Sequence, residues 1–224
     1  MWVDGSERSI ILDFVSTRSP AAGDRIELLM AARLRELRVR HDLTLDELAA
    51  RSGVSRSMIS LIERAQSSPT AHILDRLAAA LGVTLASLFT DAGQPSASPV
   101  ARRGDQRSWR DPETGYLRRN LSPSGVASPL ELVEVVLPPG ARVTYDGVAR
   151  SAPVDQQILL LAGTLEVSVG AQAHRLDPGD CLAMRVDGPT AFCNPGPGEA
   201  RYLLALTIGG VPPARIGTAR RSQP

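Results

Sequence analysis

The chain has 224 residues and a mass of 23.8 kDa, and its 25 basic and 24 acidic side chains give a net charge of +1. All of the basic residues are arginine. A content of 43% hydrophobic and 22% charged residues is typical of a globular chain and excludes a disordered one. The balance of charge excludes a globally basic protein that coats nucleic acid. It leaves a localised nucleic-acid site open, because net charge says nothing about distribution.

The sequence predicts neither a membrane span nor a secretory signal. No apolar run approaches the ~20 residues that cross a bilayer. The first 20 residues carry Asp4, Glu7 and Asp13 and lack a basic start followed by an apolar core. We therefore expect a cytoplasmic protein with no membrane partner. Its residues 1–23 are expected to form an N-terminal extension, which is either a disordered arm or an over-long start.

Residues 24–90 have the pattern of consecutive helices. The first, over 24–40, carries apolar residues at helical spacing. Thr44 followed three residues later by Glu47 is a capping-box pattern and predicts the start of a second helix. The remaining signals are an end of the second helix at Gly53, a third helix capped by Ser55, a fourth opened by Pro69 and Thr70, and a last short turn over 84–89.

The composition then changes from helical to β-like. Residues 91–109 begin with DAGQPSASPV, which is typical of a linker. Residues 110–210 contain short β-like runs with turn residues between them, a spacing of about 8–12 residues that predicts a β-sandwich or barrel. The tail over 211–224 is rich in Pro and Arg. The expected strands cover residues 130–137, 157–162, 164–169, 180–186 and 200–208.

The second and third expected helices fit a helix-turn-helix. That motif needs a small residue where its two helices cross, a glycine in the turn, and a β-branched residue that seals the second helix. Those places are occupied by Ala49, Gly53 and Ile59, with Leu48, Val54 and Ile62 at the supporting apolar positions. Because all six positions fit together, the signal is much more specific than a lone glycine.

On these residues, the chain resembles the five-helix Cro/Xre-type helix-turn-helix domain over about residues 25–89. The resemblance implies that residues 55–64 form the recognition helix, with Arg56 best placed to bind guanine in a major groove. One departure is Leu45, where the family often has glutamine, so Thr44 or backbone N–H groups are expected to take over that contact. The implied DNA-binding residues are Thr44, Ser55, Arg56, Ser57, Ser60 and Arg64.

The segments ELVEVVLPPGARV, QQILLLAGTLEVSVGAQAHRLDPGDCLAM and PTAFCNPGPGEARYLLAL resemble the cupin double-stranded β-barrel over about residues 110–208. Metal cupins present three His and one Glu at positions that correspond here to Asp146, Val148, Gln156 and Thr190. Since a catalytic divalent metal needs about three protein ligands, we expect no metal and no cofactor. The two cysteines, Cys181 and Cys193, predict neither a zinc site nor a disulfide framework, and a redox-sensing pair stays open.

The expected barrel interior offers polar groups that could bind a small effector. The effector-binding candidates are Tyr116, Arg118, Tyr145, Gln156, Met184, Thr190 and Phe192. The arginine-rich segment over 102–119 allows two interpretations. Either Arg118 or Tyr116 binds an anionic effector at the barrel mouth, or the arginines pair with acids of the barrel on a solvated strand. A barrel filled by its own side chains, which serves only for dimerisation, is a further alternative.

Together these patterns predict a multidomain protein, α then β: a five-helix helix-turn-helix bundle followed by a cupin double-stranded β-barrel. We expect a homodimeric transcriptional regulator that binds a double-stranded DNA operator and senses an unknown small-molecule effector. Two alternatives are a cupin enzyme that carries a DNA-binding head, and an architectural or antitoxin-like DNA binder with a ligand-free barrel. Residues 24–90 hold nine arginines and eight acids, so DNA affinity should depend only modestly on salt.

Overall fold

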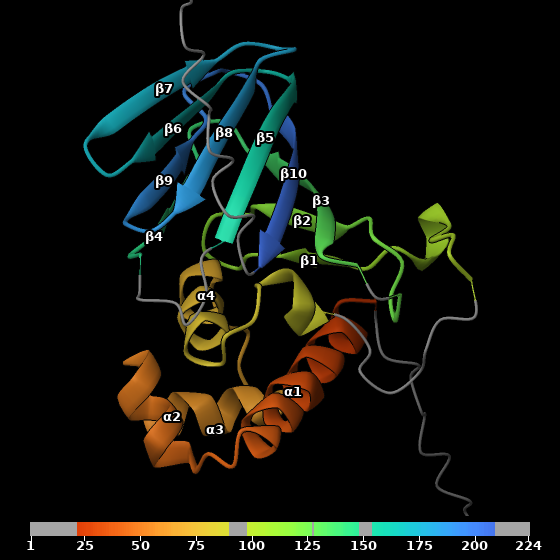
Figure 1. The fold of residues 1–224 in the computed structure, drawn as a ribbon, viewed down its shortest axis with the longest axis vertical. Coiled ribbons are helices and arrows are strands. Elements are labelled where there is room, and N and C mark those ends of the chain that lie inside the picture. Colours follow the sequence, from red (N-terminus) through yellow and green to blue (C-terminus); the bar gives the residue numbers. More distant parts are fainter. Residues whose placement is uncertain (1–21, 90–97, 127, 148–153, 209–224) are drawn as a thin grey trace, which may run out of the picture.

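The computed structural model describes residues 22–89, 98–126, 128–147 and 154–208. Three parts of the expected organisation therefore lie wholly or partly outside the described residues: residues 1–21 of the extension, residues 91–97 of the linker, and the whole tail over 211–224. In Figure 1, a helical domain lies below two β-sheets, and the chain passes from the first to the second once.

The helical domain follows the sequence pattern closely until its last segment. Its described elements are α1 (Ala22–Arg40), α2 (Leu45–Ser52), α3 (Arg56–Glu63), α4 (Ala71–Ala80) and the 3-10 helix η1 (Ala86–Phe89). The expectation of five α-helices is wrong, because the described domain has four and the fifth segment is a single 3-10 turn. The backbone N–H of Ser87 donates to the Thr84 hydroxyl at 3.0 Å, which tightens this short segment into three-residue turns.

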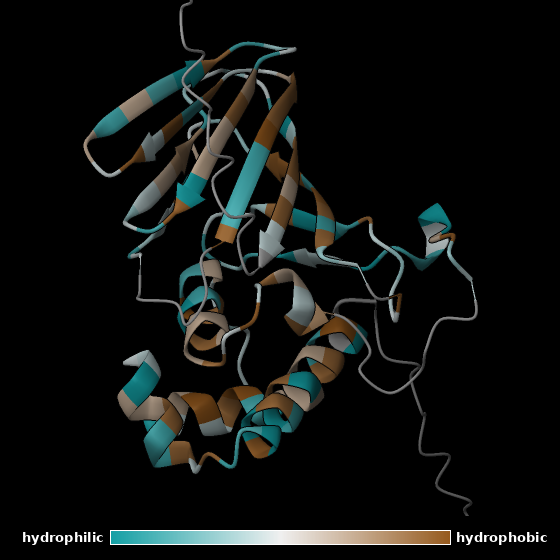
Figure 2. Cartoon of the chain, in the orientation of Figure 1, coloured by the Kyte–Doolittle hydropathy of each residue, from teal (hydrophilic) through white to brown (hydrophobic). Residues whose placement is uncertain are grey.

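Both predicted signals at the ends of α2 are confirmed. Thr44 and Glu47 form a reciprocal capping box: the Glu47 N–H donates to Thr44 Oγ1 at 3.1 Å, and the Thr44 N–H donates to Glu47 Oε2 at 2.7 Å. Gly53 ends the helix in the left-handed region, with φ of 66°. Figure 2 shows striped helices, with brown apolar segments between teal polar ones. The apolar stripes meet in a core that includes Met30, Leu34, Leu48, Ile59, Leu74 and Leu77.

The β domain consists of two antiparallel sheets. The first, in spatial order, contains β1 (Ser108–Arg110), β2 (Leu117–Asn120), β3 (Leu130–Leu137), β10 (Ala200–Ile208), β5 (Val154–Ala162) and β8 (Cys181–Val186). The second contains β4 (Arg142–Tyr145), β9 (Thr190–Cys193), β6 (Leu165–Val169) and β7 (Gln172–Leu176). Within the described residues, no strand pairing joins the two sheets, so the expected closed barrel is replaced by two facing sheets.

Aromatic side chains fill the space between the sheets. Phe192 on β9 stacks on Tyr202 on β10, with ring centroids 6.0 Å apart and planes 4° apart. Tyr145 on β4 meets the same Phe192 edge to face at 6.0 Å. The Phe192–Tyr202 stack links the two sheets through side chains, whereas the Tyr145–Phe192 contact joins neighbouring strands of the second sheet.

The two domains are packed against each other through α4, the segment after it, and the first strands of the β domain. The backbone N–H of Ala71 donates to Asp111 Oδ1 at 3.1 Å, and Asn120 Nδ2 donates to the Ala86 carbonyl at 2.8 Å. Thr84 donates to Glu131 Oε2 at 2.5 Å. We call this contact the domain interface. It also includes Phe89 stacked on Trp109, with centroids 5.5 Å apart.

An ion pair extends the domain interface to β4. Asp146, which follows β4, lies 3.2 Å from His72 Nε2 and 3.8 Å from Arg76 Nη1, and both of these residues belong to α4. Arg76 in turn donates from Nε to the Ser52 carbonyl at 2.8 Å. Helix α4 is therefore bound on one side to the β domain and on the other to the end of α2. Among the described helices, none is long and apolar enough to cross a membrane.

Candidate functional site

Helix α3 presents a polar N-terminal face to solvent. Its N-cap, Ser55, accepts a hydrogen bond from the Met58 N–H at 3.3 Å, and its hydroxyl lies 3.2 Å from that of Ser57. Ser55, Arg56 and Ser57 are all exposed, whereas Ile59 and Ile62 on the opposite side are fully buried. The buried side fixes the helix against the domain, so the exposed side is held in a defined orientation.

The Arg56 side chain has an acidic neighbour. Its Nε lies 3.2 Å from Asp46 Oδ1 on α2, and 62% of the Arg56 side chain and 75% of the Asp46 side chain remain exposed. An exposed ion pair of this kind contributes little free energy, since water screens it. Arg56 can therefore leave Asp46 for an external acceptor at small cost.

The other DNA-binding candidates differ in their exposure to solvent and in whether their side chains already make hydrogen bonds. Arg64 is exposed at the C-cap of α3, and Ser60 is half-buried on that helix. Thr44 is exposed, but its hydroxyl is engaged with Glu47 in the capping box. The hydrogen bonds from Thr44 lower the pKa of the Glu47 carboxyl, so that the cap is charged at neutral pH. Thr44 thus positions α2 and has little hydrogen-bonding capacity left for a ligand.

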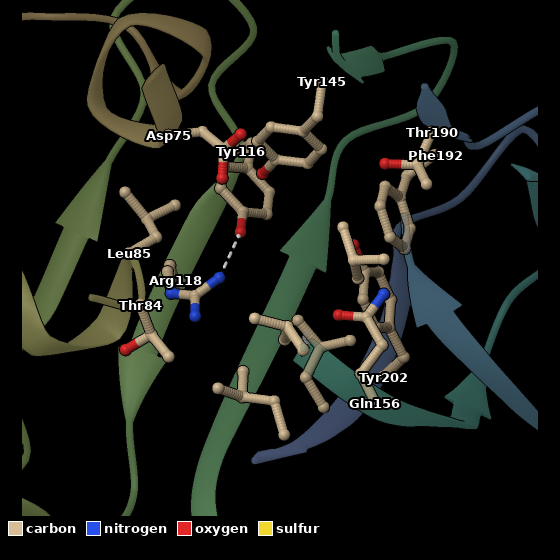
Figure 3. A pocket seen from close by; sticks show the side chains of 14 residues that line it. Asp75, Thr84, Leu85, Tyr116, Arg118, Tyr145, Gln156, Thr190, Phe192 and Tyr202 are labelled. Atoms are coloured by element: carbon tan, nitrogen blue, oxygen red, sulfur yellow. Dashed lines mark hydrogen bonds between the residues drawn. The ribbon is translucent and has the colours of Figure 1, made fainter. Parts of the chain in front are cut away.

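A second candidate site is a cavity of about 60 Å³ between the sheets and the helical domain (Figure 3). Most of its wall comes from the inner faces of both sheets. Helix α4 and the segment that follows it close the cavity from below with Asp75, Thr84 and Leu85. The β-domain residues in the wall are Tyr116, Arg118, Tyr145, Val154, Gln156, Val186, Thr190, Phe192, Tyr202, Leu204 and Leu206.

The arginine-rich segment allowed two interpretations, and the two adjacent arginines of β2 correspond to one each. Neighbouring residues of a strand face opposite sides of the sheet, so Arg118 and Arg119 point in opposite directions. Arg118 lines the cavity, is 5% exposed, and donates from Nη1 to the Tyr116 hydroxyl at 3.2 Å. Arg119 points away from the cavity and binds the buried Glu134, which also accepts from Arg201 Nε at 2.6 Å. One arginine is therefore available to the cavity, and its neighbour stabilises the sheet.

Burial sets the protonation states around the cavity. It raises the pKa of Tyr145 and of Tyr202 well above the usual range, so both hydroxyls are neutral at physiological pH. Burial likewise raises the pKa of Glu131, which accepts the hydrogen bond from Thr84 beside the cavity. The Arg118 guanidinium stays protonated, since burial lowers its pKa but the surrounding tyrosines and Glu131 raise it by more.

The cavity brings together six of the seven effector-binding candidates. The exception is Met184, which does not line the cavity although it shares one face of β8 with Val186; it lies opposite Gln156, and its sulfur accepts a hydrogen bond from Gln156 Nε2 at 3.3 Å. Along β8 the cavity wall includes Val186 but not Met184, a boundary that the sequence could not reveal. Asp146 does not line the cavity either; it pairs with α4. Val148 lies outside the described residues.

Sequence reasoning missed the part of the cavity wall that comes from the helical domain. Asp75 and Thr84 looked like ordinary helix residues, but both are buried in the structure. One signal was available in the sequence: a polar residue on the face of a helix that is expected to be buried. Such a residue needs a hydrogen-bond partner and therefore indicates a contact with another part of the protein.

Neither a metal cluster nor a disulfide is found in the described residues. No three of their His, Cys, Asp and Glu side chains converge. Cys181 is exposed on β8 in the first sheet, and Cys193 is half-buried on β9 in the second; both are free.

Comparison with known proteins supports both domains. Residues 34–88 match the family described as "Helix-turn-helix" (HTH_3). The HTH-type transcriptional regulator PuuR of Escherichia coli strain K12 is 24% identical over 178 residues, which cover 78% of this chain and 92% of that protein; PuuR of Shigella flexneri gives the same values. The crystal structure of an HTH_3 family transcriptional regulator from Vibrio cholerae is 24% identical, covers 82% of this chain and 97% of its own, and superposes with a TM-score of 0.66.

The fold and its two sites define a two-domain chain, with a helix-turn-helix domain followed by an antiparallel β domain. The Vibrio cholerae structure shares this fold across both domains. Residues 34–88 match the helix-turn-helix family, which supports the helix-turn-helix part of the resemblance seen in the sequence.

Proposed function

We propose that the protein is a homodimeric, sequence-specific transcriptional regulator that binds an operator in double-stranded DNA. Its β domain, of the cupin type and without a metal, senses a small-molecule effector. In this proposal residues 24–90 bind DNA and residues 110–210 bind the effector. One observation carries it: the cavity of the β domain is walled in part by α4 and Thr84–Leu85 of the helix-turn-helix domain. An effector in this cavity touches the DNA-binding domain directly.

The DNA contact is assigned to the exposed face of α3. Arg56 is the candidate for base recognition, because its guanidinium matches the two acceptors of guanine in the major groove. Ser55, Ser57, Ser60 and Arg64 are assigned to phosphates and neighbouring base edges, where side-chain hydroxyls and arginines bind most often. The relatives that resemble the chain are transcriptional regulators by name, which supports the same assignment.

Dimerisation follows from how such domains read DNA. Two recognition helices in successive major grooves lie about 34 Å apart on a near-palindromic operator. We expect a particle of twice the 23.8 kDa chain in light scattering coupled to size-exclusion chromatography. A monomer at micromolar concentration, with and without DNA, would contradict this part of the proposal.

The test begins with selection of operator sequences from a random DNA library by the full-length protein. The enriched site is then used in fluorescence anisotropy with unlabelled competitors. Arg56→Ala should lower the preference for the enriched site by about tenfold, since a bidentate arginine–guanine contact contributes about 1–3 kcal/mol. The matched control is Arg175→Ala, which removes an exposed arginine on β7, far along the chain from α3.

The same experiments separate the two other functions considered. No enriched sequence, or equal specificity of wild type and Arg56→Ala, contradicts sequence-specific reading by α3. Stoichiometric iron, manganese, nickel or zinc in the purified protein contradicts the metal-free sensor and favours a cupin enzyme with a DNA-binding head. DNA affinity that no small molecule changes favours an architectural binder.

A further inference from the structure

The cavity contains a buried positive charge that no described acid neutralises by contact. Arg118 is 5% exposed, and its Nε has no hydrogen-bond partner among the described residues. Its one described hydrogen bond is to a neutral acceptor, the Tyr116 hydroxyl. Glu131 contributes an attractive field at Arg118, but its carboxylate is bonded to Thr84.

A buried guanidinium with an unpartnered N–H group costs free energy unless a further hydrogen-bond acceptor binds it. A charge taken out of water needs a close counter-charge or full hydrogen bonding, and arginine lacks the option of losing its proton. The missing partner is therefore an anion or a strong acceptor that reaches Nε from inside the cavity. A carboxylate matches the guanidinium best, since its two oxygens can accept two parallel N–H groups.

The remaining wall limits the charge and shape of the ligand. Tyr145 and Tyr202 offer neutral hydroxyls, and Gln156 and Thr190 lie across the cavity from Arg118 (Figure 3). The helical domain adds the carboxyl of Asp75 and the hydroxyl of Thr84, and most of the remaining wall is aliphatic or aromatic. Arg118 is the one cationic side chain in the described wall, so the site suits one negative charge on an organic molecule, whereas a dianion would leave one charge unpaired beside Asp75.

The volume limits the size of the ligand. A cavity of about 60 Å³ holds about four water-sized groups, at about 15 Å³ for each. That space suits a carboxylate group with a short aliphatic tail.

We infer that the cavity binds a short-chain monocarboxylate, whose carboxylate pairs with the guanidinium of Arg118 and whose tail lies against the apolar wall. This inference rests on the proposed function, because it names the chemical class of the effector. The ligand bridges the two domains: Arg118 belongs to β2, while Asp75, Thr84 and Leu85 belong to the helix-turn-helix domain. Its binding is therefore coupled to the position of α4, and through α4 to DNA affinity.

The experiment uses the full-length protein and sodium propionate, with propionamide as the neutral molecule of the same shape. Binding is measured by isothermal titration and by thermal shift, with sodium chloride added so that every sample has the same ionic strength. We expect propionate to bind and to raise Tm, and propionamide to have no effect. Arg118→Met should weaken propionate binding by tenfold or more, since the charged hydrogen bonds are lost.

A second variant guards against failure of Arg118→Met to fold. Tyr116→Phe retains the ring and removes the hydroxyl that holds Arg118 in place, so propionate affinity should fall a few-fold and the Tm of the apo protein should fall slightly, because Arg118 loses its described hydrogen bond. The surface control is Arg175→Ala, which should bind propionate as the wild type does. Sodium phosphate is included to separate an inorganic anion from a carboxylate.

The outcomes distinguish this inference from the proposed function. Propionate binding that depends on Arg118, in a protein that selects no DNA sequence, supports the ligand class and overturns the regulator. A protein that reads DNA but binds none of acetate, propionate and butyrate overturns the ligand class alone. Equal binding of propionamide, binding of phosphate alone, or unchanged binding by Arg118→Met each overturns the inference. Propionate that binds through Arg118 but leaves operator affinity unchanged overturns the coupling.

Discussion

The carboxylate of Asp111 accepts a hydrogen bond from the backbone N–H of Ala71 at 3.1 Å, so an acid of the β domain caps helix α4 of the DNA-binding domain. Asp111 is 2% exposed and also accepts from the Thr114 N–H at 3.2 Å. The first N–H groups of a helix lack partners within the helix, and a negative charge there is favourable. The start of α4 is therefore completed by a residue 40 positions further along the chain.

We predict that Asp111→Ala lowers the free energy of unfolding by about 2 kcal/mol, because it removes a cap and leaves buried N–H groups without an acceptor. Urea denaturation followed by circular dichroism measures the change. Glu113→Ala, at an exposed neighbouring position, is the control and should shift the free energy by less than about 0.5 kcal/mol. Equal stability of the two variants would contradict a structural role for the interdomain cap.

Glu131 makes stability depend on pH across the domain interface. Burial raises its pKa, so the folded state favours the protonated form relative to the unfolded state. The stability associated with this group is fully present below the unfolded pKa of about 4.3 and is lost as pH rises through the higher folded pKa. Glu131→Gln should abolish this decline and be at least as stable as wild type at pH 7. Denaturation curves from pH 4 to 8 test this, with exposed Glu199→Gln as control.

Asp46 is expected to restrain DNA binding. Its carboxylate lies 3.2 Å from Arg56 Nε and places a negative charge beside the face assigned to DNA. Asp46→Asn frees Arg56 and should raise operator affinity about two- to fivefold at low salt, an effect that shrinks as salt screens the charges. Anisotropy titrations at several salt concentrations measure it. Glu113→Gln removes an exposed charge elsewhere and should leave affinity unchanged; a similar gain there would point to net charge alone.

Gly53 is required by the turn between α2 and α3. Its φ of 66° disfavours a side chain, and a Cβ there would overlap the guanidinium of Arg76. Gly53→Ala should cost about 2 kcal/mol of stability, since the left-handed conformation costs about 1–2 kcal/mol and the Arg76 bond to Ser52 is disturbed. Gly104→Ala is the control, because nothing lies within 4 Å of its added Cβ. Thermal unfolding and operator binding should decline together in the first variant only.

The helical domain was predictable because its signals are local. The capping box of Thr44 and Glu47 and the glycine at position 53 each depend on residues within one turn, and all lie where the sequence placed them. The longer apolar strands were predictable for the same reason, with β3 and β10 found at the expected residues. Short polar strands such as β7, with one buried residue among five, owe their existence to pairing with β6, which the sequence does not reveal.

The candidate sites were predictable in part. A list of cavity residues could be drawn from the cupin resemblance, but the edge of the cavity depends on how the strands pair, and Met184 fell just beyond it although it shares one face of β8 with Val186. Arg118 and Arg119 are adjacent in sequence, and only the orientation of β2 assigns one to the cavity and the other to Glu134. The contribution of Asp75 and Thr84 depends on how the two domains dock, which no local pattern encodes.

The completion of α4 by Asp111 limits how this chain can be recombined with others. In a chimera joined within residues 90–97, the helix-turn-helix domain would lack Asp111 and Trp109. The first N–H group of α4 would lose its acceptor, and the Phe89 ring would lose its stacking partner. The transferable unit extends through β1 and β2 to Asn120, the residue that donates to Ala86. A fusion of this helix-turn-helix domain to another sensor domain should therefore retain β1 and β2. We expect the domain to fold when the fusion point follows residue 120 and to fail to fold when it follows residue 90.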